Sequence, residues 1–271
     1  MNPISLPSTL KIIRKLSFPK KLGLCDKIYG RTLATYGSSW VLTSIGIPWK
    51  LDLRNPTHRW IVYGLYQDPG FLKWVKKNLP QEAVIVDSGS NIGQMLLYFA
   101  SWFPKGKILA FEPGGHARTW LEQCLKINKD FPVELLACGL GSQKSTLFIN
   151  HAEDSLMHGG QAHVSSEGEE QIEIERLDTI LESKKIKTVD LWKLDVEGYE
   201  LEALLGAEGL LKKKSVKAIY VEFSANIEQQ IIEYLRDLDY ALYYINRSGK
   251  LCIEKSSDKI SNGFFLPRFA V

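Results

Sequence analysis

Apolar and polar residues alternate along the later part of the chain in the rhythm of an α/β fold. A short β-branched run over 83–86 has the composition of a buried strand and breaks into a polar, glycine-bearing stretch over 87–93. The apolar residues that follow, Met95, Leu96, Phe99 and Phe103, have helical spacing. The pattern therefore predicts a strand, a tight turn and a helix, the opening unit of a doubly wound sheet that binds its ligand at the carboxyl ends of the strands.

The same rhythm continues toward the C-terminus. Strands are expected over 107–111, 133–138, 189–194 and 218–223, and helices over 117–128, 199–206 and 227–238. Residues 144–178 interrupt it, because 145–150 and 171–176 alternate like antiparallel strands around a polar loop. Residues 241–245 and 263–266 have the pattern of a closing antiparallel pair. The expected fold is α/β, with a mostly parallel doubly wound sheet and an antiparallel C-terminal strand.

Residues 1–80 follow a different pattern, so we expect them to form an N-terminal accessory or cap segment before a ligand-binding domain over 81–271. Residues 51–54 alternate like an edge strand, 59–66 suit either a strand or a short helix, and 71–79 suit a helix. Four tryptophans lie here: Trp40, Trp49, Trp60 and Trp74. Such aromatic residues either form a small core of their own or stack on an acceptor molecule.

The beginning of this segment is strongly basic. Between Lys11 and Arg31 there are seven basic residues and one acid, Asp26. Leu10 and Ile13 fall on one helical face, which predicts a short basic amphipathic helix within 10–21. Such a helix either rests on an anionic membrane surface or packs on the domain as a solvated helix, and the sequence leaves both interpretations open.

Composition indicates an ordinary globular protein. The chain has 271 residues, of which 45% are hydrophobic and 24% charged, and its net charge of +3 is too small to imply nucleic-acid binding. The four cysteines include no Cys-x-x-Cys pair, so we interpret them as reduced thiols of a cytoplasmic protein. Lys11, Arg14 and Lys15 interrupt the only early apolar stretch, and no apolar run has the length of a membrane span. The expected location is cytoplasmic, with peripheral contact at the inner membrane face as an option; the oligomeric state is not indicated.

The chemistry of the 87–93 turn limits its ligand. A dinucleotide-binding turn needs Gly-x-Gly-x-x-Gly, but Asn91 and Gln94 stand where the second and third glycines should be. A P-loop is excluded because no Gly-Lys-Ser/Thr follows, and Asp87 would repel a diphosphate. The pattern suits a ligand with a cationic head and no phosphate, such as S-adenosylmethionine (SAM). A purely structural strand-to-helix turn is the alternative.

Three further groups are candidates for chemistry. Glu112 stands at the tip of the second strand, where nucleotide-binding α/β folds hold the ribose hydroxyls. Asp195 and Glu197 follow strand 189–194, and residues two apart on a strand face the same way, so we expect both carboxylates on one side of the ligand-binding edge. His151, His158 and His163 lie in the polar loop with gaps that fit no common zinc pattern, so we expect no metal; a single histidine that reaches over the site as a base is the alternative role for this loop.

Five short motifs occur in the order of a known family. They are Asp-Ser-Gly-Ser-Asn-Ile-Gly at 87–93, Phe-Glu-Pro at 111–113, Leu-Asp-Thr-Ile at 177–180, Lys-Leu-Asp-Val-Glu-Gly at 193–198 and Val-Glu-Phe at 221–223. From about residue 80 onward the chain resembles the FkbM-type SAM-dependent methyltransferases. The resemblance implies a class I methyltransferase Rossmann-like fold and O-methylation of a sugar, glycolipid or secondary metabolite.

The same resemblance implies roles for particular residues. The residues expected to hold SAM are Asp87, Ser88, Gly89, Ser90, Asn91, Gly93, Glu112, Pro113, Cys138 and Asp195. The transferred methyl would lie beside Asp195 and Glu197, and the general base would be Asp195 first, then Glu197, then His151 or His158. Ser88 and Ser90 stand where the family more often has a hydrophobic residue and an alanine.

Two rival functions stay open. A non-catalytic scaffold that binds SAM or nothing has no signature that the sequence could exclude. An NAD-dependent oxidoreductase on a similar sheet is disfavoured by the missing glycines. For a methyltransferase, the partner would be a small-molecule or glycan acceptor whose identity the sequence does not indicate, and no nucleic acid is expected.

Overall fold

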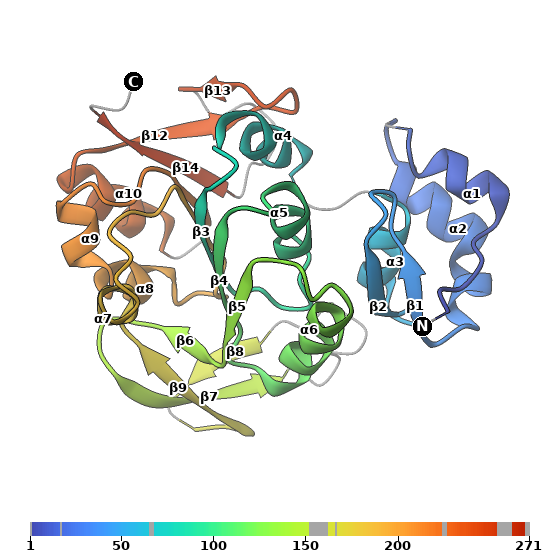
Figure 1. Ribbon diagram of the computed structural model, residues 1–271, viewed down its shortest axis with the longest axis horizontal. Helices are drawn as coiled ribbons and strands as arrows, with labels where there is room; N and C mark the ends of the chain where they lie inside the picture. Colours follow the sequence, from blue (N-terminus) through green and yellow to red (C-terminus); the bar gives the residue numbers. More distant parts are fainter. Residues whose placement is uncertain are drawn as a thin grey trace.

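The structure of the protein is a computed structural model that describes residues 2–16, 18–64, 68–151, 162–165, 167–223, 227–253 and 262–268. Its centre is a sheet of eight strands in the order β13-β12-β14-β11-β10-β3-β4-β5 (Figure 1). The strands are β3 (Val84–Ser88), β4 (Lys107–Phe111), β5 (Val133–Leu136), β10 (Leu191–Leu194), β11 (Ile219–Glu222), β12 (Tyr240–Ile245), β13 (Leu251–Cys252) and β14 (Asn262–Pro267).

The direction of the strands confirms the predicted sheet. Strands β5, β4, β3, β10 and β11 are parallel to one another, whereas β14 runs antiparallel to both β11 and β12. The chain enters the sheet at β3 and winds outward in both directions, so the carboxyl ends of β3, β4, β10 and β11 meet at one edge. Such an edge is where α/β sheets bind ligands.

Helices cover both faces of this sheet. They are α4 (Pro69–Asn78), α5 (Leu96–Trp102), α6 (Gly115–Ile127), α7 (Leu177–Ser183), α8 (Glu200–Leu205), α9 (Glu208–Lys212) and α10 (Glu228–Asp237). Neighbouring strand residues alternate between two cores: Ile85 packs in the core that includes Phe99, and Val86 in the core that includes Leu204. Burial on both faces explains why the strands are continuous apolar runs in the sequence.

The segment in which strands and helices stop alternating contributes to a second, four-stranded sheet. Its strands are β6 (Cys138–Leu140), β7 (Ser145–His151), β8 (Ala162–Ser165) and β9 (Glu170–Glu175), in the order β6-β9-β7-β8. The predicted antiparallel pair β7 and β9 is confirmed. The predicted strand 133–138 is wrong at its end, because β5 stops at Leu136 and Cys138 begins β6, which pairs with β9 instead of β4.

The N-terminal residues form a small unit beside the sheet (Figure 1). It contains α1 (Ser8–Ile13), α2 (Lys21–Ala34), β1 (Ser38–Leu42), β2 (Pro48–Asp52) and α3 (Pro56–Val62). Segment 59–66, which suited a strand or a helix, contributes to α3, whose N-cap Asn55 accepts a hydrogen bond from the Thr57 amide. The edge strand expected over 51–54 lies earlier, because β2 ends at Asp52.

Two further features of the N-terminal region differ from expectation or refine it. The single helix expected within 10–21 is wrong in extent, because α1 ends at Ile13 and α2 begins at Lys21. Helix α4 lies on the main sheet, where Phe71 stacks on Tyr220 with ring centroids 3.6 Å apart. No helix in the described part of the chain is long and apolar enough to cross a bilayer.

Candidate active site

The turn after β3 is in direct contact with the loop after β10. Gly89 and Gly93 have φ angles of +74° and +94°, and the amides of Gly89 and Ser90 both donate to the Phe111 carbonyl at 3.0 Å. A Cβ atom at Gly89 would lie 1.7 Å from the Asp195 carbonyl oxygen. Glycine is therefore required here both by the left-handed backbone and by the close approach of the loop after β10.

Glu112 joins this turn to the end of β4. Its side chain accepts hydrogen bonds from the Asn91 amide at 2.7 Å and from the Gly114 amide at 2.9 Å, and the residue is only 8% exposed. Burial raises the pKa of Glu112 to about 7, against the opposing effect of the two amide donors. The acid thus stands at the expected end of β4, and its contact with a ribose stays a prediction.

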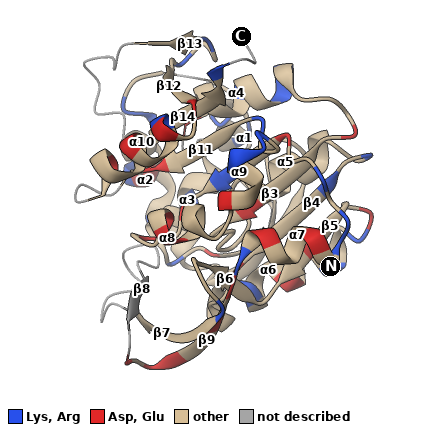
Figure 2. Ribbon diagram, turned by 90° about the vertical axis from the view of Figure 1, so that its left-hand side faces the viewer, with Lys and Arg blue, Asp and Glu red and all other residues tan. Residues whose placement is uncertain are grey.

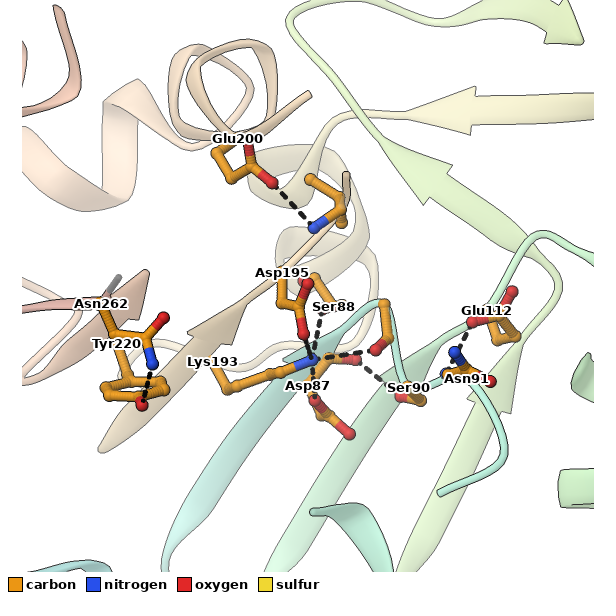
Figure 3. A network of polar contacts seen from close by, with 12 residues as sticks. Asp87, Ser88, Ser90, Asn91, Glu112, Lys193, Asp195, Glu200, Tyr220 and Asn262 are labelled. Carbon is orange, nitrogen blue, oxygen red and sulfur yellow. Dashed lines mark hydrogen bonds and ion pairs between the residues drawn. The ribbon is translucent and has the colours of Figure 1, made fainter. Parts of the chain in front are cut away.

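Lys193 is buried at the centre of the polar edge (Figure 3). Its Nζ atom lies 3.1 Å from Asp195 Oδ2 and 3.5 Å from Asp87 Oδ1, and it donates to the Gly89 carbonyl at 2.9 Å. Burial alone would lower the pKa of Lys193, but the charges of Asp195 and Asp87 outweigh it and raise the pKa. The ammonium group therefore stays charged and ties the end of β10 to the end of β3.

Glu222, at the end of β11, hydrogen-bonds to Asp195. Burial, this hydrogen bond and the charge of Asp195 raise the pKa of Glu222 to about 8. Burial would also raise the pKa of Asp195, but Lys193 and the hydrogen bond from Glu222 hold it below its usual value. At neutral pH the pair therefore consists of an ionised Asp195 and a protonated Glu222 that donates to it.

The loop after β10 is held by a buried acid that the sequence reading did not select. Glu200 is 2% exposed, and its Oε1 accepts from the Val196 amide at 3.0 Å and the Gly198 amide at 3.1 Å (Figure 3). The argument that Asp195 and Glu197 share a strand face is wrong, because β10 ends at Leu194 and Glu197 has a φ of +52°. Asp195 is partly buried against Lys193, whereas Glu197 is exposed.

Both serines that depart from the family pattern have partners inside the protein. The indole of Trp192 donates to Ser88 Oγ at 2.8 Å, and Ser90 Oγ donates to the Asp87 carbonyl at 2.9 Å. Ser88 is fully buried on the opposite face of β3 from Asp87. Its hydroxyl group therefore accepts the hydrogen bond that the buried indole N–H of Trp192 requires, which explains a polar residue at this position.

The remaining candidates lie at the margin of this cluster or outside the described residues. Cys138 begins β6 and is half-buried, and burial raises its pKa to about 11. The Pro113 carbonyl accepts from the Arg118 guanidinium. His158 lies outside the described residues, as does the side chain of His151, whose backbone ends β7. No group of three or more potential metal ligands occurs in the described part of the chain.

Lys193 and Glu222 are the functional candidates that sequence reasoning missed. The sequence did contain a signal for Lys193, which is a lysine within an otherwise apolar strand. A charged side chain in a buried strand needs a partner of opposite charge, and Asp195, two residues later, lies on the side where such a partner is expected. No comparable signal links Glu222 to Asp195. Their contact depends on β10 and β11 being neighbours in the sheet.

The polar groups at this edge suit the ligand that the sequence predicts. Asp87, Glu112 and Asp195 present carboxylate oxygens, and the buried Oδ1 atom of Asp87 has only the Lys193 ammonium group beside it, at the ion-pair distance of 3.5 Å. SAM is rich in donors, with an ammonium group, ribose hydroxyls and an adenine amine, and its sulfonium is cationic. Carboxylates at the ends of β3, β4 and β10 would hold those groups.

Comparison with known proteins agrees with this geometry. The chain matches the methyltransferase FkbM domain over residues 87–242, more than half of its 271 residues. It is 33% identical over 162 residues to methyltransferase sdnD of Sordaria araneosa, and this match covers 48% of this chain and 62% of that protein. It is 30% identical over 149 residues to methyltransferase 1 of Beauveria bassiana, which covers 48% and 60%. The chain thus spans about 60% of the length of these two curated relatives.

Two other similarities are more distant. The hexuronic acid methyltransferase AglP of Haloferax volcanii is 27% identical over 177 residues, which covers 65% of this chain and 70% of that protein. Among solved structures, precorrin-6y C5,15-methyltransferase from Geobacter metallireducens superposes with a TM-score of 0.42 and 12% identity, covering 72% of this chain and 84% of that one. From the motifs, the sheet order and the domain match, the chain belongs to the FkbM methyltransferase family, and its fold is the class I methyltransferase fold that uses SAM as methyl donor.

Proposed function

We propose that the protein is a SAM-dependent O-methyltransferase that acts on a hydroxyl group of a sugar, glycolipid or secondary metabolite. The observation that carries the proposal is the contact among Lys193, Asp195 and Glu222 at the edge of the sheet where class I folds bind their ligands. It provides one ionised carboxylate that is partly exposed and fixed in position by a buried cation.

The reaction asks two things of the residues at this edge. SAM, when bound, supplies an already activated methyl group, so the protein has to place the acceptor oxygen in line and take up its proton. An alcohol does not ionise at neutral pH, but its proton becomes far more acidic as the oxygen forms its new bond. An ionised carboxylate is then a sufficient base, and Asp195 is the group that can accept this proton.

Lys193 and Glu222 set the state of that base. Lys193 keeps Asp195 ionised, and the proton on Glu222 fixes the orientation of the Asp195 carboxylate. Glu197, which is exposed on the following loop, is the second candidate for the base. All three of these relatives are named as methyltransferases, and the name of one, AglP, includes hexuronic acid, which supports a sugar among the acceptors to be tried first.

The deciding experiment compares Asp195→Asn with Glu197→Gln. The acceptor is first identified by incubation with labelled SAM and a cell extract or a panel of glycosides that includes hexuronic acids. We expect Asp195→Asn to reduce the single-turnover rate by roughly 10²–10⁴-fold and SAM affinity far less, because the amide cannot take the proton. Glu197→Gln should retain most of the rate.

Other outcomes of the same experiment assign the roles differently. A larger rate loss in Glu197→Gln would exchange the two roles. Loss of SAM affinity in Asp195→Asn would show that Asp195 binds the ammonium group of the cofactor. If both variants keep full turnover, the base is elsewhere, and His151 and His158 are the next to test.

The rival functions are separated by ligand binding alone. Calorimetry with SAM, S-adenosylhomocysteine and NAD should give binding of the first two and none of the third. Binding of NAD would favour an oxidoreductase. Binding of SAM without any labelled product from an extract would favour a non-catalytic SAM-binding protein.

A further inference from the structure

Exposed apolar side chains are concentrated in the N-terminal unit. Among the described residues, ten large hydrophobic side chains are exposed, and eight of them lie between residues 12 and 60: Ile12, Leu16, Leu24, Ile28, Tyr36, Leu42, Ile45 and Trp60. A soluble domain normally scatters such residues singly. Four of the eight belong to α1, α2 and the segment between them.

Helices α1 and α2 form an antiparallel pair whose inner side is already used. The buried ammonium group of Lys21 donates to the carbonyls of Arg14 and Leu16 at 2.9 and 2.7 Å, and Tyr29 donates to Thr9 at 2.8 Å. Inward-facing residues of both helices, Leu10, Cys25 and Leu33, are at most 1% exposed. Of the two interpretations that the sequence left open, packing on the domain therefore accounts only for the inner face of the helices.

The outer side of the pair is apolar. Ile12 is 63% exposed, Leu16 54%, Leu24 48% and Ile28 54%. On α2, Leu24, Lys27, Ile28 and Arg31 have the spacing i, i+3, i+4 and i+7, so they line one face of the helix. Packing against the rest of the protein therefore does not explain why these four side chains are apolar.

The charges around these apolar residues have a single sign. Lys11, Lys15, Lys20, Lys27 and Arg31 are all exposed, and none of them makes an ion pair with a described residue. The one acid of the segment, Asp26, is paired with Arg59 at 2.7 Å and accepts from Tyr63. By contrast, the side of the molecule with α7, α8, α9 and α10 carries acidic and basic residues interspersed (Figure 2).

We propose that the outer face of α1 and α2 binds the surface of an anionic lipid bilayer. Ile12, Leu16, Leu24 and Ile28 would enter the interface between headgroups and acyl chains, and the five cations would contact lipid phosphates. An exposed apolar stripe with lysine and arginine beside it, and no free acid, is complementary to such a surface in both polarity and charge. The pair also lies at the outer margin of the molecule, on the far side of β1 and β2 from the main sheet, so it is free to meet a flat surface (Figure 1).

The test measures how the full-length protein sediments with vesicles of phosphatidylcholine mixed with phosphatidylglycerol, and with vesicles of phosphatidylcholine alone. We expect binding to the anionic vesicles, weaker binding to the neutral ones, and a decline with added salt. The double variant Leu24→Glu with Lys27→Glu removes an apolar contact and reverses a charge, and should lower the partition coefficient by roughly tenfold or more.

A matched double variant controls for net charge. Ile127→Glu with Lys126→Glu makes the same changes on α6, where Ile127 is 42% exposed, and should leave vesicle binding unchanged. Both variants should keep the wild-type affinity for SAM, which shows that they are folded. Equal binding by the two variants, equal binding to both kinds of vesicle, or no binding by the wild type would overturn the proposal. So would self-association of the wild type that only the α2 variant loses, since a second copy would then cover this face.

Discussion

At the scale of single residues, the polar edge depends on one buried lysine. Lys193 lies within ion-pair distance of two carboxylates, and Asp87, one of the two, is 1% exposed. A buried charge without a partner is costly, so each of the three groups requires the others. Asp195 differs from Asp87 in being partly exposed, which leaves it free to meet a ligand.

Gly89 is the residue at which a small substitution should have a large effect. In Gly89→Ala, the new methyl group would lie 1.7 Å from a backbone oxygen of Asp195, which no side-chain rotation can relieve, and alanine disfavours a φ of +74°. We expect the free energy of unfolding to fall by about 1–3 kcal/mol or more, and SAM affinity to fall because the two loops separate. Urea unfolding and a SAM titration measure the two effects.

Gly23→Ala is the matched control for this substitution. Gly23 lies within α2, and a Cβ atom there would meet nothing within 4 Å. Alanine should therefore be neutral or stabilising by up to about 1 kcal/mol. Equal effects of the two substitutions would mean that the contact between the loops is unimportant.

Glu112 should make cofactor binding depend on pH. Its pKa is raised by burial to about 7, and ribose hydroxyl groups donate better to the ionised form. SAM affinity should therefore increase as the pH rises through about 7, by at most roughly tenfold per pH unit below the pKa. Isothermal titrations between about pH 6 and 8 measure this slope.

The variant Glu112→Gln is the control, because any dependence of SAM affinity on pH that remains in it comes from the ligand and not from Glu112. The variant should bind SAM roughly ten- to a thousandfold more weakly, because two charge-assisted hydrogen bonds are lost, and should lack the rise at pH 7. A slope that is the same in both proteins would exclude Glu112 as a ribose ligand that acts in its ionised form.

At the scale of elements, the N-terminal unit supports the cofactor turn. The indole of Trp49, on β2, donates to the Ile92 carbonyl at 3.1 Å, and the Lys50 amide of the same strand donates to Cys124 on α6. Trp49 is fully buried, so among the four tryptophans this one belongs to the core and does not stack on an acceptor. Strand β2 therefore fixes the turn from outside the main sheet.

Removing that single hydrogen bond should weaken SAM binding. Trp49→Phe keeps most of the aromatic bulk but leaves the buried Ile92 carbonyl without its donor, which costs about 1–3 kcal/mol of unfolding free energy. Because Ile92 lies within the turn, we expect SAM affinity to fall several-fold as well. Trp60→Phe is the control: Trp60 is 37% exposed, and its substitution should change the stability by less than about 0.5 kcal/mol.

At the scale of the whole molecule, buried carboxyl groups should give stability an unusual pH dependence. The folded protein retains protons on Glu112 up to about pH 7 and on Glu222 up to about pH 8. In the unfolded chain both lose them near pH 4.5. The folded state therefore binds more protons than the unfolded state in this range, so this stabilisation is complete below about pH 4.5 and is lost as the pH rises through 7 and 8.

We expect the free energy of unfolding without SAM to decline between about pH 7 and 8. His58, whose pKa burial lowers to about 4, acts in the opposite direction only below its unfolded value of 6.5 and does not contribute in this window. Urea unfolding across the window measures the decline, and the double variant Glu112→Gln with Glu222→Gln should reduce it. A stability that increases with pH would show that these two carboxyl groups are ionised in the folded protein.

The sequence by itself determined the elements and their order. The bounds expected for β4 agree with the structure, those expected for β11 agree to within one residue at each end, and those expected for β3 agree to within two. The antiparallel pair around the polar loop was visible as alternation. Local patterns suffice for this because burial on both faces of a parallel sheet leaves long apolar runs, and a glycine-bearing turn between a strand and a helix is a short-range signal. The five motifs in order also identified the family.

Only the tertiary structure decided which polar groups meet. Asp87, Lys193 and Glu222 are far apart in the sequence and come together because β3, β10 and β11 are neighbours in the sheet. The end of β10 at Leu194 separated Glu197 from the face of Asp195, and the pairing of β6 with β9 took Cys138 out of the main sheet. Strand pairing and strand ends depend on contacts between distant segments, so the protonation of the site, which follows from those contacts, could not be deduced from local pattern.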